Sequence, residues 1–317
     1  EVVRAIEQEG IHLIGRHELD HVDVVAPGHG QVLQILGLHD EPTPGRVLVS
    51  LGDLAVRQLP AADLILAFKP DSAADIGASS AVTASLQALT ASGADFFLAL
   101  GDMSYDDIKP ESGWCAYIKE HLGETYPFQL LVGNHEEYPS GPNGFIDNFA
   151  ACLPDRLNVT GSYAHRYYFD YPPGAPLARF VLIDPDLNRG GTKAQFCKGG
   201  ETDNCGWLQE RIDEAKQQGL WTIVGMHKNC LTMGVKSCEI GADLLNMLVD
   251  LKVDLVLQGH DHGYQRSKQL SLTAGCLLVP TDAYNANCVA DDGSDGVYKR
   301  HMGLVFAITA VIGRGPY

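Results

Sequence analysis

The segment Gly-His-Asp-His-Gly-Tyr-Gln-Arg at residues 259–266 is separated by one residue, Gln258, from a largely apolar run at residues 253–257. A short apolar run bounded by turn residues is typical of a β-strand that is covered on both faces. The histidines that follow it carry imidazole groups, which bind divalent metals well. The segment therefore predicts a buried strand with candidate metal ligands, His260 and His262, at its end.

Three other apolar runs end in the same way, each in a residue that can bind a metal. They are residues 96–100, 128–132 and 221–226, followed by Asp102, Asn134 and His227 respectively. Helical patterns lie between them, for example at residues 81–91 and 203–218. In open α/β sheets, ligands gather beyond the carboxyl ends of the strands. The alternation predicts an α/β protein, and the four polar tips together predict one shared site.

The N-terminal part of the chain has a different pattern. Strand-like segments at residues 22–26, 31–38 and 46–51 are separated by Gly, Pro and Asp. We expect residues 1–65 to form a small β-rich region and residues 66–317 to form the catalytic domain.

The composition excludes several classes of partner. The formal net charge is −17 over 317 residues. Such a chain repels the phosphate backbone of nucleic acids, so no nucleic-acid partner is expected. No apolar run reaches the length of a membrane span. An anionic small-molecule substrate would need local positive charge, which bound metal cations would supply.

Eight cysteines are present, and none forms a Cys-x-x-Cys pair, which disfavours a cysteine-based zinc site. We predict three local disulfides and one longer one: Cys197–Cys205, Cys230–Cys238, Cys276–Cys288 and Cys115–Cys152. Disulfides form in oxidising compartments, so a secreted or periplasmic protein is expected.

Five blocks of sequence offer carboxylate, amide, imidazole and phenol groups, which suit two adjoining cations. They are Ala74-Asp75-Ile76-Gly77, Gly101-Asp102-Met103-Ser104-Tyr105, Gly133-Asn134-His135-Glu136, Val224-Gly225-Met226-His227 and Gly259-His260-Asp261-His262. Over residues 75–266 this set resembles the purple acid phosphatases, a branch of the metallophosphoesterases. The resemblance implies a four-layer α/β/β/α sandwich.

The resemblance also implies a role for each residue. The first metal would be held by Asp75, Asp102, Tyr105 and His262, and the second by Asn134, His227 and His260, with Asp102 bridging both. His135 would stand beside the metals, to stabilise the transition state or to protonate the leaving oxygen. A phenolate favours a trivalent ion, so iron is expected at the first site and iron, zinc or manganese at the second. Alternatively, Tyr105 is a packed aromatic residue without a metal contact.

The expected reaction is the attack of a metal-bound hydroxide on a small phosphomonoester. A phosphodiesterase with the same metals, acting on a lipid head group or a cyclic nucleotide, is the alternative within the enzyme class. A non-catalytic binding protein of the same fold is the alternative from another class. The intact His135 argues against it, because a scaffold has no need for an unligated imidazole.

The first block departs from the family pattern. Ala74 stands where the family has Gly, and Pro70 interrupts the strand expected at residues 64–68. Asp71 is therefore a competitor for Asp75, and Asp75 could also serve only as a helix cap.

Two other patterns are set aside. Residues 17–21 partly resemble the metallo-β-lactamase block His-x-His-x-Asp-His, but Arg16 and Glu18 stand where it requires histidines. We interpret these residues as loop histidines. No Gly-x-Ser-x-Gly turn is present to support a serine hydrolase.

Overall fold

The computed structural model describes residues 71–294, 298–310 and 313, together with the backbone of residues 70 and 297 and of four short N-terminal strands. These strands are β1 (Ile6–Gln8), β2 (Ile11–Leu13), β3 (Val32–Gln34) and β4 (Val49–Ser50). The metallo-β-lactamase-like residues 17–21, the expected strands at 22–26 and 64–68, and the expected domain boundary at residue 65 lie outside the described residues.

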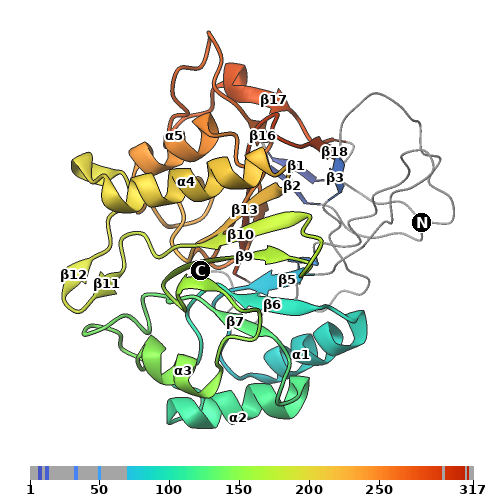
Figure 1. Cartoon of the computed structure of the whole chain (residues 1–317), viewed down its shortest axis with the longest axis vertical. Helices are drawn as coiled ribbons and strands as arrows, with labels where there is room; N and C mark the ends of the chain where they lie inside the picture. The colour runs from blue at the N-terminus through green and yellow to red at the C-terminus, as the bar shows by residue number, and fades with distance from the viewer. Residues whose placement is uncertain are drawn as a thin grey trace, which may run out of the picture.

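A seven-stranded mixed sheet forms one half of the molecule (Figure 1). Its order is β15 (Tyr264–Arg266), β19 (Val305–Thr309), β14 (Leu255–Gln258), β13 (Trp221–Gly225), β10 (Ala178–Leu182), β9 (Arg166–Tyr171) and β8 (Thr160–Ser162). The four central strands from β19 to β10 run parallel, and the outer strands pair antiparallel to them.

A four-stranded sheet forms the other half. Its order is β4, β5 (Pro70–Ala73), β6 (Phe96–Ala99) and β7 (Phe128–Leu130), with β5, β6 and β7 parallel. The strand that leads into the first block is thus Pro70–Ala73. Pro70 begins this strand, a position where its missing N–H group is tolerated, and no strand had been predicted at these residues.

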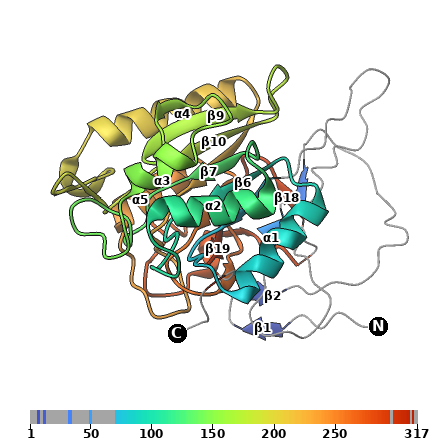
Figure 2. The ribbon, with the colours of Figure 1, turned by 90° about the horizontal axis from the view of Figure 1, so that it is seen from below.

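In the part of the chain that the structure describes, five α-helices cover the outer faces of the two sheets. They are α1 (Ser80–Ser92), α2 (Glu111–Leu122), α3 (Ile146–Cys152), α4 (Asp203–Gln217) and α5 (Ala242–Asp250). In Figure 1, α4 and α5 lie above the sheets and α1, α2 and α3 lie below them. Seen from below, α1 and α2 cross the front of the molecule (Figure 2). The predicted four-layer α/β/β/α sandwich is confirmed.

Three apolar cores hold the layers together. Because successive side chains of a strand point to opposite faces of the sheet, alternate residues of one strand belong to different cores. Phe96 and Leu98 of β6 face the seven-stranded sheet, where they pack with Phe180 of β10. The alternate residues Phe97 and Ala99 face α1, α2 and α3. A third core lies between the seven-stranded sheet and helices α4 and α5. Strands buried on both faces read as continuous apolar runs, which is why the sequence revealed them.

The four predicted disulfides are present: Cys115–Cys152, Cys197–Cys205, Cys230–Cys238 and Cys276–Cys288. The disulfides Cys197–Cys205 and Cys230–Cys238 each join cysteines that are eight residues apart in sequence. Cys230–Cys238 follows shortly after His227, which stands at the tip of a strand. Small two-stranded pairs complete the description: β11 (Asn188–Arg189) with β12 (Thr192–Lys193), β16 (Gln269–Leu270) with β17 (Val289–Asp291), β1 with β2, and β3 with β18 (Val297–Lys299). Two short 3₁₀ helices are Lys198–Gly200 and Ala286–Cys288.

The carboxyl ends of the parallel strands in both sheets meet at one place. The backbone N–H of Ala74, just after β5, donates to Thr309 O at the end of β19 at 3.2 Å. The Asp75 N–H donates to Gly101 O at 3.1 Å, and the Gly259 N–H donates to His227 O at 2.9 Å. The first of these bonds joins the tips of the two sheets, and the other two join neighbouring strand tips within each sheet, so the polar residues that follow the strands are brought together.

Candidate metal centre

Asp102 stands at the centre of the polar cluster. One of its carboxylate oxygens and one ring nitrogen each of His227 and His260 lie within 4.8 Å of one another, and all three residues are buried. Among the residues that the structure describes, no other group of three His, Cys, Asp or Glu side chains converges this closely. The carboxylate therefore lies where ligands from both sheets meet.

His227 and Asn134 lie on one side of Asp102. The Nδ1 atom of His227 lies 2.8 Å from the carbonyl oxygen of Leu100, so Nδ1 carries the proton and Nε2 faces the site. This Nε2 lies 3.0 Å from Asn134 Oδ1 and 3.3 Å from Asp102 Oδ1. A ring nitrogen, an amide oxygen and a carboxylate oxygen thus face a common point.

Asp75, Tyr105 and His262 lie on the other side. The Tyr105 hydroxyl lies 2.6 Å from Asp75 Oδ1 and 2.9 Å from Asp102 Oδ2. The His262 Nε2 atom lies 3.2 Å from Asp75 Oδ1 and 3.3 Å from the Tyr105 hydroxyl. The structure therefore gathers the seven predicted ligands into two groups that share Asp102.

His260 is held by a carboxylate that the sequence analysis did not identify. Its Nε2 atom lies 2.9 Å from Glu239 Oε1, which leaves Nδ1 as the ring nitrogen available to a metal. Glu239 Oε2 is paired with Lys228 at 2.8 Å, and Lys228 also contacts Asp186 at 3.0 Å. A carboxylate on the outer nitrogen of a metal-binding histidine fixes the ring orientation and makes the ring a stronger ligand.

His135 lies beside the cluster and is partly open to solvent, with 26% of its side chain exposed. Its Nε2 atom lies 3.6 Å from Asp102 Oδ2, and its ring lies 4.3 Å from the Tyr105 ring. Its Nδ1 atom is bonded to Asn143 Oδ1. This bond turns Nε2 toward the cluster.

Glu136 supports the cluster from behind. Its carboxylate, which is fully buried, accepts bonds from the backbone N–H groups of Asp102, Met103 and Gly133 at 3.0, 2.6 and 3.3 Å. Burial first, and then the negative charge of Asp102, raise the pKa of Glu136 to about 8 in the metal-free chain. One carboxylate therefore fixes the tips of β6 and β7 relative to each other.

Two glycines in the motifs allow the strand tips to approach. A Cβ atom on Gly133 would lie 2.2 Å from Asp102 Oδ1, and a Cβ atom on Gly259 would lie 2.3 Å from the Cβ atom of Ala74. Neither space could hold the extra carbon without movement. Ala74, the departure from the family pattern, is therefore accommodated because Gly259 opposite has no side chain.

Four of the seven clustered residues have a left-handed backbone: Asp75, Asp102, Tyr105 and His260 have φ values of 58°, 55°, 49° and 69°. Positive φ is uncommon for residues other than Gly and is tolerated best by Asp, Asn and His. Such residues gather at functional sites, where the surrounding structure imposes the conformation. The backbone at the strand tips is therefore shaped to direct these side chains inward.

The protonation states show why the cluster needs cations. Burial, followed by the carboxylates of Asp75 and Asp102, raises the pKa of Tyr105 far above its ordinary value. Burial would also raise the pKa of Asp102, but His227 and His135 outweigh it and hold the pKa well below its ordinary value. Burial would lower the pKa of His227, whereas Asp102 raises it to about 9. In the metal-free chain, the positive charge of the His227 imidazolium thus stabilises the buried Asp102 carboxylate, as a bound metal cation would.

The donor set fits metal ions by its chemistry. Two carboxylates, three imidazoles, one amide oxygen and one phenol converge, and Asp75, Asp102 and His227 are almost fully buried. Buried carboxylates without cations are expensive. Carboxylate, imidazole and amide groups suit iron, zinc and manganese.

Two alternatives for the first block are wrong. Asp71 lies within β5 and accepts a bond from Ser92 of α1 at 3.4 Å, so it is on the helix side and not among the clustered residues. The N-cap of α1 is Ser79, whose side chain accepts from Val82 N, so Asp75 does not cap the helix. The Tyr105 hydroxyl bonds to the carboxylates of Asp75 and Asp102, and its role as a metal ligand stays a prediction.

Four supporting residues were not identified as such from the sequence: Glu136, Asn143, Lys228 and Glu239. Glu136 belongs to a quoted motif, and its position after His135 was the only available signal. Asn143 and Glu239 lie on loops 8 and 21 residues from the histidines that they contact, and no spacing rule marks such pairs.

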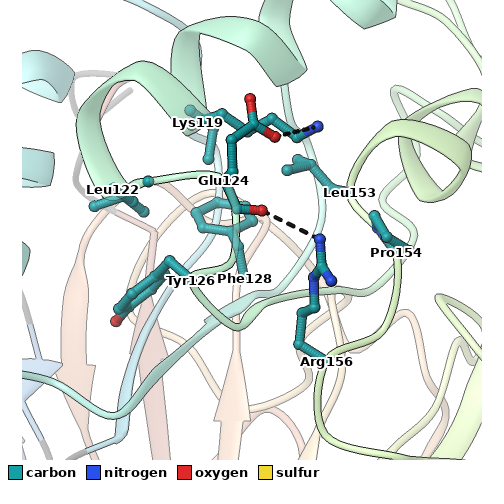
Figure 3. Close-up of a pocket in the computed structure, with 10 residues that line it drawn as sticks. Lys119, Leu122, Glu124, Tyr126, Phe128, Leu153, Pro154 and Arg156 are labelled. Carbon is teal, nitrogen blue, oxygen red and sulfur yellow. Dashed lines mark hydrogen bonds and ion pairs between the residues drawn. The ribbon is translucent and has the colours of Figure 1, made fainter.

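Two depressions on the surface differ greatly in size. Figure 3 shows the smaller one, beside α2, where Glu124 pairs with Lys119 and its carbonyl oxygen accepts from Arg156. Its volume is about 10 Å³, which is scarcely room for one water molecule. The larger cavity has a volume of about 440 Å³, which suits a small organic molecule, and it is lined by residues such as Tyr138, His165 and Arg189.

The calcineurin-like phosphoesterase family matches residues 36–264, which is more than half of the chain. The chain belongs to this family. The predicted resemblance to metallophosphoesterases of the purple acid phosphatase type is confirmed.

The relatives are distant. An uncharacterized protein of Mycobacterium tuberculosis, Rv2577, is 26% identical over 55% of this chain and 35% of its own length. A purple acid phosphatase of Glycine max is 25% identical over 56% of this chain and 38% of its own length. The solved structure of purple acid phosphatase PPD1 from yellow lupin seeds is 16% identical, covers 77% of this chain and 46% of its own, and has a TM-score of 0.47. The chain thus spans less than half the length of these relatives.

Proposed function

We propose that this chain is a dinuclear-metal phosphatase that hydrolyses phosphomonoesters. The observation that supports the proposal is the pair of ligand groups around Asp102: Asn134, His227 and His260 on one side, and Asp75, Tyr105 and His262 on the other. A single carboxylate shared by two groups suits two adjoining cations. Iron is proposed for the group with the phenol, and iron, zinc or manganese for the other.

When bound, the two cations supply Lewis acidity for the phosphoryl oxygens and lower the pKa of a water molecule to generate the nucleophile. Asp102 would hold both cations and keep their spacing fixed. Tyr105, which lies between two carboxylates, would ionise only in their presence. Asn134 and His227 would complete the second site, with Leu100 O keeping the His227 ring in place.

His135 is proposed as the proton donor to the leaving oxygen. Because Nδ1 is bonded to Asn143 Oδ1, Nε2 is the nitrogen that carries the transferable proton. Its partial exposure lets the ring regain that proton from solvent. A proton placed on the leaving oxygen typically accelerates ester cleavage by about 10²–10⁴-fold.

We also propose that the protein works outside the cytoplasm. Four disulfides are consistent with an oxidising compartment. None of the helices in the described part of the chain is long and apolar enough to cross a membrane. A small phosphate ester is the proposed partner.

Metal content per chain, measured by mass spectrometry on protein purified without chelator, tests the metal centre. About two metals with at least one iron would support the proposal, and a phenolate-to-iron absorption band should then accompany them. Two zinc or manganese ions would keep the hydrolase but not the iron. Less than one metal after reconstitution would refute the dinuclear centre.

Rates on p-nitrophenyl phosphate and bis(p-nitrophenyl) phosphate test the reaction. A higher kcat/KM on the monoester supports the phosphatase, whereas a higher value on the diester would favour the phosphodiesterase. The His135→Ala variant should keep its metal content and lose about 10²–10⁴-fold in kcat. Turnover equal to that of the parent chain would remove His135 from the mechanism.

A further inference from the structure

The cavity of about 440 Å³ is not explained by the metal centre. Three separate segments line it: the loop and helix start at residues 138–147, the end of β8 with His165, and the β11 hairpin. Its size lies within the range of small-molecule sites, which is about 300–1,000 Å³.

The cavity opens at the edge of the sheets that carries the metal ligands. The Val132 N–H donates to Ala164 O at 2.9 Å. Val132 is two residues before Asn134, and Ala164 precedes the cavity residue His165. Leu182 of β10 pairs both with Gly225 of β13 and with Tyr167 of β9. His227 and His165 therefore lie at the same edge, two strand spacings or about 10 Å apart.

The loop that follows His135 forms one wall of the cavity. Tyr138 is three residues from His135, and three extended residues span at most about 11 Å. Phe145 is two residues from Asn143, whose side chain contacts the His135 ring. The group that would protonate the leaving oxygen thus stands next to this wall.

The wall is aromatic. The rings of Tyr138 and Phe145 lie 5.2 Å apart at 68°, and Ile146 lies beside them. Tyr138 is 54% exposed, although it is a large apolar residue. Edge-to-face and offset contacts with such rings contribute about 0.5–1.5 kcal/mol beyond area burial. A flat ring is the group that this wall would bind best.

The charged side chains around the cavity give no surplus of positive charge. Both Nε and Nη2 of Arg189 are bonded to the buried carboxylate of Asp184. His165 lies between Asp184 at 3.3 Å and Asp147 at 3.5 Å. The two carboxylates offset the charges of the guanidinium and the imidazole, so no net positive charge is left to attract an anion. A second phosphate or a carboxylate is therefore disfavoured in the cavity.

We propose that this cavity is the subsite for the leaving group, and that it takes an uncharged aromatic alcohol such as an aryl or nucleoside portion of a phosphomonoester. The inference rests on the proposed function, because it needs a phosphoryl group at the metal centre. The ester oxygen would lie near His135, and the ring would extend over Tyr138 and Phe145.

The test compares kcat/KM for 2-naphthyl phosphate with that for ethyl phosphate in the parent chain and in Tyr138→Ala. The ratio of the two values should fall by roughly 2–12-fold, mainly through KM for the aryl ester. Tyr138→Phe should keep the ratio, since it keeps the ring. Tyr284→Ala, which removes another exposed tyrosine, is the matched control and should leave the ratio unchanged.

The outcomes separate the two proposals. A parent chain that hydrolyses neither ester, even when loaded with metal, overturns both. A parent chain that hydrolyses both esters, with an unchanged ratio in Tyr138→Ala, overturns the subsite alone. Phe145→Leu provides a second variant on the same wall, and the thermal midpoint of each variant checks that it folds.

Discussion

Replacement of Glu239 by Gln removes the negative charge from the outer nitrogen of His260. The present contact joins His260 Nε2 to Glu239 Oε1 at 2.9 Å, and Lys228 supports it from the other oxygen at 2.8 Å. A hydrogen bond to a charged group contributes about 1.5–3 kcal/mol, against about 0.5–1.5 kcal/mol for a neutral one. The loss is therefore about 1–1.5 kcal/mol, or close to tenfold in affinity for the second metal.

Glu239→Ala should have a larger effect. It leaves His260 Nε2 without this partner and leaves Lys228 paired with Asp186 alone. Loss of a supporting group of this kind typically lowers metal affinity by about 10–100-fold, so the alanine variant is expected near the upper end. Affinity for the second metal should therefore decrease from the parent chain to Glu239→Gln and decrease further in Glu239→Ala.

Competition with a chromophoric chelator measures this affinity directly, without any substrate. Glu214→Gln provides the control, because Glu214 of α4 pairs with Arg179 of β10, away from the clustered residues. Equal metal affinity in the parent chain and both Glu239 variants would refute the reasoning. The backbone would then suffice to orient the His260 ring.

Three further predictions concern packing, cross-linking and metal loss. Gly259→Ala should lower metal content and reduce activity at least tenfold. The control Gly263→Ala should be neutral, because a Cβ atom there meets nothing within 4 Å. Equal metal content in the two variants would contradict the packing argument. Replacing Cys230 and Cys238 by serine should lower the free energy of unfolding, measured by chemical denaturation, by about 2–3 kcal/mol and should weaken metal binding through the neighbouring Glu239. Replacing Cys276 and Cys288 by serine should lower the free energy of unfolding alone. Removal of the metals by a chelator should lower the thermal midpoint of unfolding by several degrees, because an ion at a thousandfold excess over its Kd adds about 4 kcal/mol to the free energy of unfolding. An unchanged midpoint in calorimetry would argue against buried metal ligands.

Much of the fold could be predicted because the strands are buried on both faces. β6, β13 and β14 appear in the sequence as apolar runs, and each is followed by a polar residue of the site. The strand directly before Asp75, Pro70–Ala73, was not predicted, because Pro70 was interpreted as a break and not as the first residue of a strand. Three of the disulfides could be predicted because their cysteines are 8 to 12 residues apart, and Cys115–Cys152 is the pair that then remains.

The supporting contacts of the site could not be predicted, and the reason is physical. Glu239 reaches His260 because the Cys230–Cys238 loop is drawn toward Asp261, whose carboxylate accepts from Thr232, Val235 and Lys236. That arrangement depends on the fold as a whole. The larger cavity is likewise lined by residues of three segments whose proximity no local pattern encodes.

The left-handed backbone at Asp75, Asp102, Tyr105 and His260 has a consequence for laboratory evolution. Each such residue opposes stability by up to about 1–2 kcal/mol, least for Asp and His and most for Tyr105. Gly or Asn at Tyr105 would relieve that opposition and destroy a candidate ligand at the same time. A selection for heat resistance alone is therefore expected to enrich inactive chains altered at this position, and selection for turnover must accompany it.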